Sequence, residues 1–276
     1  MQAKELPPAE NDVAVLLLFF TGTEALQRIF NIIRQARPAR LFLYQDGPRN
    51  EAETIMTIAA RNIVADEQID WQCDVRRNYH TTNQGMRAST YDSLQWAFCL
   101  HDKCIVLEES STPAVTFVRF CTELLHRYEN DLRIGMIAGV NHEETTDSPY
   151  DYLFTTMIPV WGWASWRRVV DGWDSTYSVV DDEFNMHQLE TLSQRECGWK
   201  KKLKMMRRHK LLGQPTYETV LWSYLALHSC LTIVPTRNMI HNSAMPAHEL
   251  TFPLRHPRLV IEDVAYKHRV SRIIRW

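Results

Sequence analysis

Two adjacent carboxylates, Glu108 and Glu109, follow directly on the apolar run 104–107. That run predicts a buried strand, and ligands of parallel α/β sheets bind outside the carboxyl ends of the strands. A pair of carboxylates at such an end suits a divalent cation, a ribose diol or the hydroxyls of a sugar. The same pair is also compatible with an ordinary solvated turn after a strand, so other residues must decide between these interpretations.

Polar residues follow the other predicted strands as well. Thr21-Gly22 comes after the apolar run 13–20, and Asp46-Gly47-Pro48, a strong turn signal, comes after 41–44. If these strands are parallel, their polar ends lie at one edge of the sheet together with Glu108. The sequence contains neither G-x-G-x-x-G nor G-x-x-x-x-G-K-[ST], which disfavours a classical dinucleotide fold and a P-loop.

Strand and helix patterns alternate through the first 110 residues. Strands are predicted at 13–20, 41–44, 71–75 and 104–107, and helices at 24–34, 51–65 and 86–100. The eight apolar residues of 13–20 are typical of a strand that is buried on both faces. The alternation therefore predicts the α/β class, with a mostly parallel sheet flanked by helices.

The remaining residues show weaker patterns. They predict a helix at 113–128, a strand at 134–139, a loop over 141–152, a helix near 216–229 and a strand at 231–234. No internal repeat and no linker rich in Pro, Gly or Ser divides the 276 residues. We therefore expect a single domain, 1–276.

Composition excludes several classes of protein. The chain is 45% hydrophobic with nine glycines and twelve prolines, which excludes disordered and collagen-like chains. No apolar run approaches the roughly 20 residues of a membrane span. The six cysteines show no metal-binding spacing and most lie in apolar stretches, which indicates reduced thiols. Because the polar, acidic N-terminus lacks the features of a signal peptide, we expect a cytoplasmic protein.

Basic charge is concentrated late in the chain, although the net charge is only −2. Residues 199–213 carry seven Lys and Arg side chains and no acid, and 255–276 form a second basic stretch. Such clusters attract the phosphates of nucleic acid, lipid or glycan. The alternative is a solvated helix face, with Leu203, Met206 and Leu211 packed on the other side.

Six motifs occur in an order that is typical of one family. They are Asp46-Gly47-Pro48-Arg49, Asn83-Gln84-Gly85, Trp96-Ala97-Phe98, the stretch IVLEES at 105–110, FVRFCTELL at 117–125 and WGWASWRR at 161–168. The set resembles the GT-A fold nucleotide-diphospho-sugar transferases of bacteria and phages, distantly similar to the N-acetylglucosaminyltransferase I type. The resemblance covers about residues 13–260. It implies a Rossmann-like GT-A domain with a nucleotide-sugar-binding half, 13–140, and an irregular acceptor-side half, 141–276.

The resemblance implies a nucleoside-diphosphate sugar as donor, with a UDP-sugar as the first choice. The donor-binding residues that it implies are Phe20, Thr21, Asp46, Arg87, Glu108, Glu109 and Ser110. In this assignment Asp46 contacts the base, and Glu108 and Glu109 contact the ribose and the sugar. The first-strand motif of the family, FNRPE, reads FTGTE at 20–24, so the family arginine is missing.

The resemblance also implies a Mn²⁺ or Mg²⁺ ion on the diphosphate. The family motif Glu-Asp-Asp reads Glu108-Glu109-Ser110 here, and the third acid is the one that holds the ion. A hydroxyl is a poorer ligand for a hard cation than a carboxylate, which argues against strong metal dependence. Glu109, Ser110 and His248 are the implied ligands, although a lone histidine is also compatible with a structural role.

Glu218 is the candidate general base. The stretch TYETVLW at 216–222 resembles the family stretch TWDxxW, whose acid deprotonates the acceptor hydroxyl. The implied reaction is a single displacement that inverts the anomeric centre. Glu218 is also compatible with a helix N-terminal acid that interacts with the helix dipole. On the acceptor side, Trp161, Gly162 and Trp163 resemble a loop that closes over the donor sugar, and three core tryptophans are the alternative.

The acceptor and the turnover remain open at this point. The family implies a glycan or lipid-linked glycan, made in the cytoplasm or at the membrane surface. The basic stretches 200–210 and 255–275 allow a DNA acceptor instead, such as hydroxymethylated bases glycosylated in the host cytoplasm by phage enzymes. The departures at Gly22, Ser110 and Glu218 allow a degenerate protein that binds sugar nucleotides without turnover. A pure nucleic-acid-binding module is disfavoured, because no motif of that class occurs.

Overall fold

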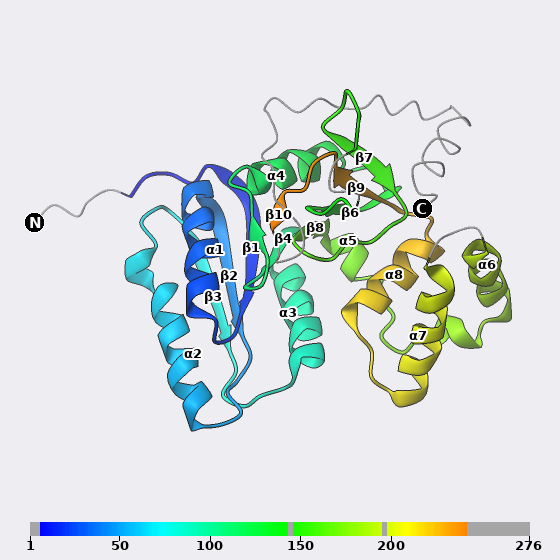
Figure 1. Cartoon of the computed structure of the whole chain (residues 1–276), viewed down its shortest axis with the longest axis horizontal. Helices are drawn as coiled ribbons and strands as arrows, with labels where there is room; N and C mark the ends of the chain where they lie inside the picture. The colour runs from blue at the N-terminus through cyan, green and yellow to red at the C-terminus, as the bar shows by residue number, and fades with distance from the viewer. Residues whose placement is uncertain (1–5, 143–145, 195–197, 242–276) are drawn as a thin grey trace, which may run out of the picture.

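The computed structural model describes residues 6–142, 146–194 and 198–241 (Figure 1). Their main sheet has eight strands in the order β3-β2-β1-β4-β8-β6-β9-β7. The strands are β1 (Asn11–Phe19), β2 (Pro38–Gln45), β3 (Asp74–Tyr79), β4 (Lys103–Glu108), β6 (Ile134–Ala138), β7 (Tyr152–Thr155), β8 (Trp163–Trp166) and β9 (Leu231–Pro235). Only β7 and β8 run antiparallel to their neighbours in this sheet. The predicted α/β class with a mostly parallel sheet is confirmed.

Helices cover both faces of this sheet, and α6 and α7 lie beside it (Figure 1). They are α1 (Thr23–Ala36), α2 (Glu51–Ile63), α3 (Met86–Leu100), α4 (Phe117–Arg127), α5 (Arg167–Val170), α6 (Glu183–Ser193), α7 (Trp199–Leu212) and α8 (Tyr217–Leu227). Successive side chains of a strand point to opposite faces. Val15 and Leu17 accordingly pack in the core cluster of α1 and α4, whereas Leu16 packs in the cluster of α3 and α8. The uninterrupted apolar run of β1 is thus explained by burial on both faces.

A third core cluster joins α6, α7 and α8 beside the sheet. Leu203 and Met206 of α7 are buried in it, as the solvated-helix interpretation of the basic stretch expects. Leu211 is not packed there, because it is 86% exposed at the C-terminal end of α7. A small antiparallel pair, β5 (Thr112–Pro113) with β10 (Ile240–His241), completes the described strands.

Three predicted boundaries are wrong, each for a local reason. The strand predicted at 71–75 is Asp74–Tyr79; Trp71 is buried ahead of it, where its indole donates a hydrogen bond to the carbonyl of Pro38 (2.8 Å). The helix predicted from residue 113 begins at Phe117, because β5 pairs with β10. The loop predicted through 152 ends earlier, since β7 begins at Tyr152.

The described thiols agree with the expectation of reduced cysteines. The five cysteines in the described ranges are free, and they are Cys73, Cys99, Cys104, Cys121 and Cys230. Among the helices of those ranges, none combines the length and the apolar character needed to cross a bilayer.

Candidate functional site

The carboxyl ends of β1, β2 and β4 lie side by side. Leu18 of β1 is in register with Tyr44 of β2 on one side and with Glu108 of β4 on the other. Helices α2 and α3 begin on this edge, which is the lower side in Figure 1. The edge therefore collects the polar residues that the sequence places after each strand, as expected for a parallel sheet.

Glu109 closes the end of β1. Its Oε2 accepts hydrogen bonds from the backbone N–H groups of Phe20 (2.8 Å) and Gly22 (3.3 Å), and its own N–H donates to Leu18 (2.9 Å). A Cβ at Gly22 would lie 3.3 Å from Cδ of Glu109, so a small residue lets the two segments approach. Glu109 thus joins the β1–α1 turn to β4.

Glu108 contacts helix α8 through Tyr217. The buried hydroxyl of Tyr217 donates a hydrogen bond to Oε1 of Glu108 (3.3 Å). Burial raises the pKa of Glu108, the bond from Tyr217 opposes this rise, and the charge of Glu218 adds to it. The ring of Tyr217 stacks on Trp163, with centroids 6.3 Å apart and planes within 8°. Sequence reasoning did not assign Tyr217 to the site, although it lies beside the candidate base.

Glu218 lies half-buried in the first turn of α8, and its charge acts on Lys202 and His209 of α7. Burial lowers the pKa of Lys202, and the charge of Glu218 raises it. Burial also lowers the pKa of His209; Arg87 of α3 lowers it further, and Glu218 opposes this shift. Nδ1 of His209 is buried without a hydrogen-bond partner in the part of the chain that the structure describes.

Strand β4, helix α7 and helix α8 thus carry charged groups that influence one another electrostatically around Glu108 and Glu218. The sequence singled out Arg87 by resemblance, and Lys202 only as one member of a basic run. Neither Lys202 nor His209 was predicted as a site residue. Their spacing of seven residues, which puts them on one helix face together with Leu203 and Met206, is the signal that could have found them.

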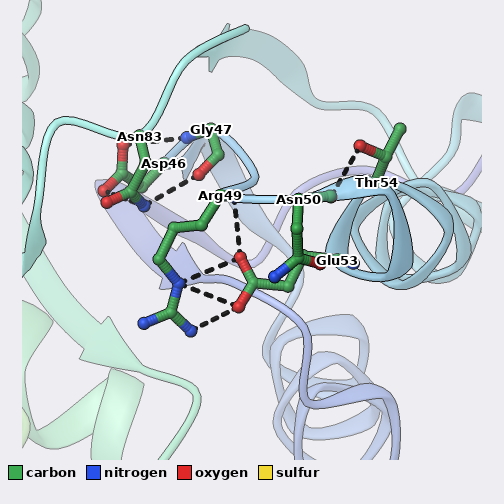
Figure 2. A network of polar contacts seen from close by, with 7 residues as sticks. All are labelled: Asp46, Gly47, Arg49, Asn50, Glu53, Thr54 and Asn83. Carbon is green, nitrogen blue, oxygen red and sulfur yellow. Dashed lines mark hydrogen bonds and ion pairs between the residues drawn. The ribbon is translucent and has the colours of Figure 1, made fainter.

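Asp46 is the anchor of the loop that leads into α3. Its Oδ1 accepts from the N–H groups of Gly47 and Gln84 (both 2.8 Å), and its Oδ2 accepts from Gly85 N–H and Asn83 Nδ2 (both 3.1 Å). Asn83 also donates to the carbonyl of Gly47 (2.8 Å), as Figure 2 shows. A carboxylate has about four lone-pair sites, so these bonds use its acceptor capacity. The resemblance implies that Asp46 contacts a nucleotide base, but both of its carboxylate oxygens already accept hydrogen bonds from the protein.

The tightness of this junction requires a glycine. A Cβ on Gly47 would come within 2.3 Å of the backbone carbon of Thr82. Next to it, the guanidinium of Arg49 bonds to Glu53 (2.8 Å) and lies 5.7 Å from the centroid of the half-buried Phe20 ring. Figure 2 shows Arg49 and Glu53 beside the Asp46 anchor. An aromatic ring and a planar guanidinium thus flank the end of β1.

The tryptophan motif divides between surface and core. Trp161 is 39% exposed, whereas Trp163 is fully buried and stacks on Phe98 as well as on Tyr217. Gly162 has a φ of +62°, and a Cβ there would clash with Ile240. Of the motif tryptophans Trp161 and Trp163, only Trp161 is therefore exposed to a ligand. Trp163 packs against the ring of Tyr217 in the core.

The described residues do not fit a divalent cation. Within 6–142, 146–194 and 198–241, no three His, Cys, Asp or Glu side chains gather where they could hold a metal ion. One carboxylate oxygen of Glu109 faces backbone amides, and Ser110 is an exposed turn residue. His248 lies outside the described residues, as does the basic stretch 255–275.

The comparisons with known proteins concern the fold alone. Neither a protein-family model nor a curated protein matches the sequence. The structure is similar to a mannosyltransferase from Pyrobaculum calidifontis in complex with GDP-Man and Mn²⁺ (12% identity over 61% of this chain and 49% of that chain, TM-score 0.41). The chain thus spans about half the length of that protein.

Two further solved structures are similar over 58% of this chain. One is a UDP-glucose pyrophosphorylase complexed with UDP-glucose (8% identity, 78% of that chain, TM-score 0.33). The other is a 4-diphosphocytidyl-2C-methyl-D-erythritol synthase from Anaerococcus prevotii (13% identity, 74% of that chain, TM-score 0.32). At these identities and TM-scores, the similarity assigns no activity, substrate or residue role to this chain.

Proposed function

We propose that this protein is a glycosyltransferase that moves a sugar from a nucleoside-diphosphate sugar, a UDP-sugar first, to an acceptor hydroxyl. One observation carries the proposal: Tyr217 of α8 bonds to Glu108 at the carboxyl edge of a parallel sheet, and the charge of the next residue, Glu218, acts on both Glu108 and Lys202. In this arrangement Glu108 can bind the sugar hydroxyls and Glu218 can act as the base. Lys202 supplies positive charge for the leaving diphosphate.

The donor lies across the ends of β1, β2 and β4 in this proposal. Phe20 and Arg49 offer flat surfaces on which a base can stack. Helix α3 has no side-chain N-cap, so its first backbone N–H groups are available to an anion. Because Arg87 lies in this first turn, the diphosphate is expected there.

Glu218 acts as the general base in this scheme. It takes the proton of the acceptor hydroxyl while the hydroxyl oxygen attacks the anomeric carbon. The bond between that carbon and the diphosphate oxygen breaks, and the electron pair leaves with the diphosphate. Arg87 and Lys202 stabilise the developing charge, and the anomeric configuration inverts. Glu108 holds the sugar hydroxyls.

The two halves of the single domain divide the substrates. Residues 13–140 carry the donor edge, and 141–276 carry Glu218 and the exposed Trp161 on the acceptor side. We propose a glycan or lipid-linked glycan as acceptor and a cytoplasmic location.

The test combines ligand binding with turnover. Thermal-shift measurements with nucleoside diphosphates and their sugars, each with and without Mn²⁺, identify the donor, since ligand at 100 times its Kd stabilises by about 2.7 kcal/mol. Glu218→Gln is then expected to lower transfer at least ~100-fold while donor affinity is kept. Glu183→Gln is the matched control, because Glu183 is an exposed first-turn acid of α6.

Full activity of Glu218→Gln would refute the base, and equal losses in both variants would indicate a helix-dipole effect instead. A wild-type protein that binds a sugar nucleotide without any turnover would identify the degenerate alternative. Absence of a thermal shift with every nucleotide would contradict the donor site.

A further inference from the structure

Helix α7 presents a basic stripe to solvent. Lys200, Lys204 and Arg208 are exposed and spaced four residues apart, so they share one helix face. Leu211 continues the same face one turn later. The opposite face, with Leu203 and Met206, is buried against the α6–α8 cluster.

Four cations of α7 are free to meet an external anion. Lys200, Lys201, Lys204 and Arg208 form no ion pair within the described ranges, and α7 itself contains no acid. Two others are already engaged, since Arg207 pairs with Glu190 and Lys210 pairs with Asp181. The seventh cation, Lys202, is half-buried, so the exposed unpaired charge of α7 lies on its outward face.

Large apolar side chains stand at the end of this stripe. Leu211 is 86% exposed and Leu212 51% exposed. Met86, at the start of α3, is 85% exposed, and with Leu211 it is one of the two most exposed large hydrophobic residues in the described ranges. Met86 begins α3 and Leu211 lies in the last turn of α7, and these two helix ends are on the lower side of Figure 1. The charge of Arg87, the residue after Met86, lowers the pKa of His209 of α7, so the first turn of α3 and the last turn of α7 lie within electrostatic range of each other.

Cations combined with protruding apolar tips match the chemistry of an anionic bilayer. Headgroup phosphates attract Lys and Arg at the surface, and leucine and methionine side chains enter the boundary with the acyl chains. Duplex DNA would use the same cations, but its phosphates give Leu211 and Met86 no apolar surroundings. The exposed leucines therefore favour a lipid surface.

We propose that the outward face of α7, together with Leu211, Leu212 and Met86, docks the protein peripherally on an anionic lipid bilayer. The cationic stripe holds the headgroups, and the three apolar tips insert among them. This docking goes beyond the proposed sugar transfer and does not depend on it. It would place the α7–α8 connection, and with it Glu218, toward the membrane.

Vesicle sedimentation with the full chain tests the proposal. Wild type is expected to bind vesicles that contain phosphatidylglycerol at least ~10-fold more tightly than pure phosphatidylcholine vesicles. Combined Lys204→Gln and Arg208→Gln substitutions should weaken this binding at least about fivefold, and added salt should weaken it as well. Combined Leu211→Ser and Leu212→Ser substitutions should also weaken it, about 10-fold.

A matched control variant tests whether loss of any exposed apolar side chains weakens vesicle binding, or only loss of those at the end of α7. Ile55 and Ile58 of α2 are 68% and 52% exposed and lie on another helix. The Ile55→Ser and Ile58→Ser double variant should bind vesicles like wild type. Because all substituted side chains are exposed, each variant should keep its circular dichroism and melting temperature.

Three results would overturn the proposal. The first is no preference for anionic vesicles. The second is unchanged vesicle binding by the leucine variant. The third is tighter binding to short duplex DNA than to vesicles, lost in the cation variant and kept in the leucine variant; this would assign the stripe to nucleic acid. None of these results bears on Glu218, whose test is the transfer assay.

Discussion

The hydroxyl of Tyr217 donates a hydrogen bond to Glu108 across 3.3 Å and so joins the first turn of α8 to the carboxyl end of β4. This contact connects the two halves of the chain at the proposed site. It also places Glu218, the next residue, where its charge acts on Glu108. The arrangement predicts that the protonation of Glu108 depends on α8.

Tyr217→Phe should therefore change the pH dependence of activity. The bond from Tyr217 lowers the pKa of Glu108, so its loss raises that pKa further. If ionised Glu108 holds the sugar, the acidic limb of the pH–rate profile moves to higher pH by about one unit. Stability should fall by about 1 kcal/mol.

Tyr224→Phe is the control for this variant. Tyr224 lies on the same helix, and its hydroxyl donates to the carbonyl of Arg168 (3.3 Å). It should cost similar stability in urea unfolding and leave the pH–rate profile in place. A profile that stays unchanged in Tyr217→Phe would contradict the coupling.

Glu108→Gln should gain stability relative to the wild-type protein as the pH rises. Burial raises the pKa of Glu108 above its ordinary value of 4.5, so the folded protein holds this proton over a pH range where the unfolded chain has lost it. Between these two pKa values stability falls with rising pH, because the unfolded state binds fewer protons. Glutamine removes this dependence.

The measurement is urea unfolding of both proteins on each side of pH 4.5. The stability of Glu108→Gln minus that of wild type should be constant below pH 4.5 and grow above it. Tyr217→Phe should do the opposite and steepen the fall of stability with pH. A difference that is independent of pH would show that the pKa of Glu108 is unshifted in the fold.

Local sequence patterns were sufficient to predict strands β1, β2 and β4 and helices α1 to α3. The predicted helix at 86–100 agrees with α3 at both ends, because its pattern starts after Gly85 and its packing residues repeat with the helical period. The run 13–20 is β1 within two residues, since eight consecutive apolar residues are typical of a short strand that is buried on both faces. The third strand was predicted three residues too early, because Trp71 was included in it. Trp71 is buried, but it lies ahead of β3.

The site depends on contacts that no local pattern encodes. Asp46 looked available to a ligand, but its oxygens are occupied by the loop 83–85, which is nearly 40 residues away in the sequence. Lys202 looked like one of seven surface cations, and only the packing of α7 against α8 brings it within electrostatic range of Glu218. Such assignments need the tertiary structure.

Asp46→Asn should loosen the loop that leads into α3. An amide in place of the carboxylate puts N–H against the N–H donors of this loop and leaves some without an acceptor. Because Asp46 is only 9% exposed, we expect a loss of about 2 kcal/mol in stability. Hydrogen exchange at the amides of Gln84 and Gly85 should accelerate.

Asp171→Asn provides the comparison, since Asp171 is exposed and should change stability by less than about 0.5 kcal/mol. If Asp46→Asn kept full stability and slow exchange at Gln84 and Gly85, the anchoring role would be wrong. Asp46 would then be free for the base contact that the resemblance implies.

Glu109 distinguishes a structural carboxylate from a metal ligand. Glu109→Ala leaves the N–H groups of Phe20 and Gly22 without their acceptor and should cost about 2 kcal/mol in the free protein. Glu109→Gln keeps a carbonyl oxygen that can accept both bonds, so most of this stability should return.

A cation ligand behaves differently, because glutamine lacks the charge that a hard ion requires. If Glu109 held an ion on the diphosphate, both variants would lose any Mn²⁺-dependent donor shift, and neither would change the stability of the free protein. Urea unfolding without ligand, followed by thermal shifts with donor and Mn²⁺, therefore separates the two roles in one pair of variants.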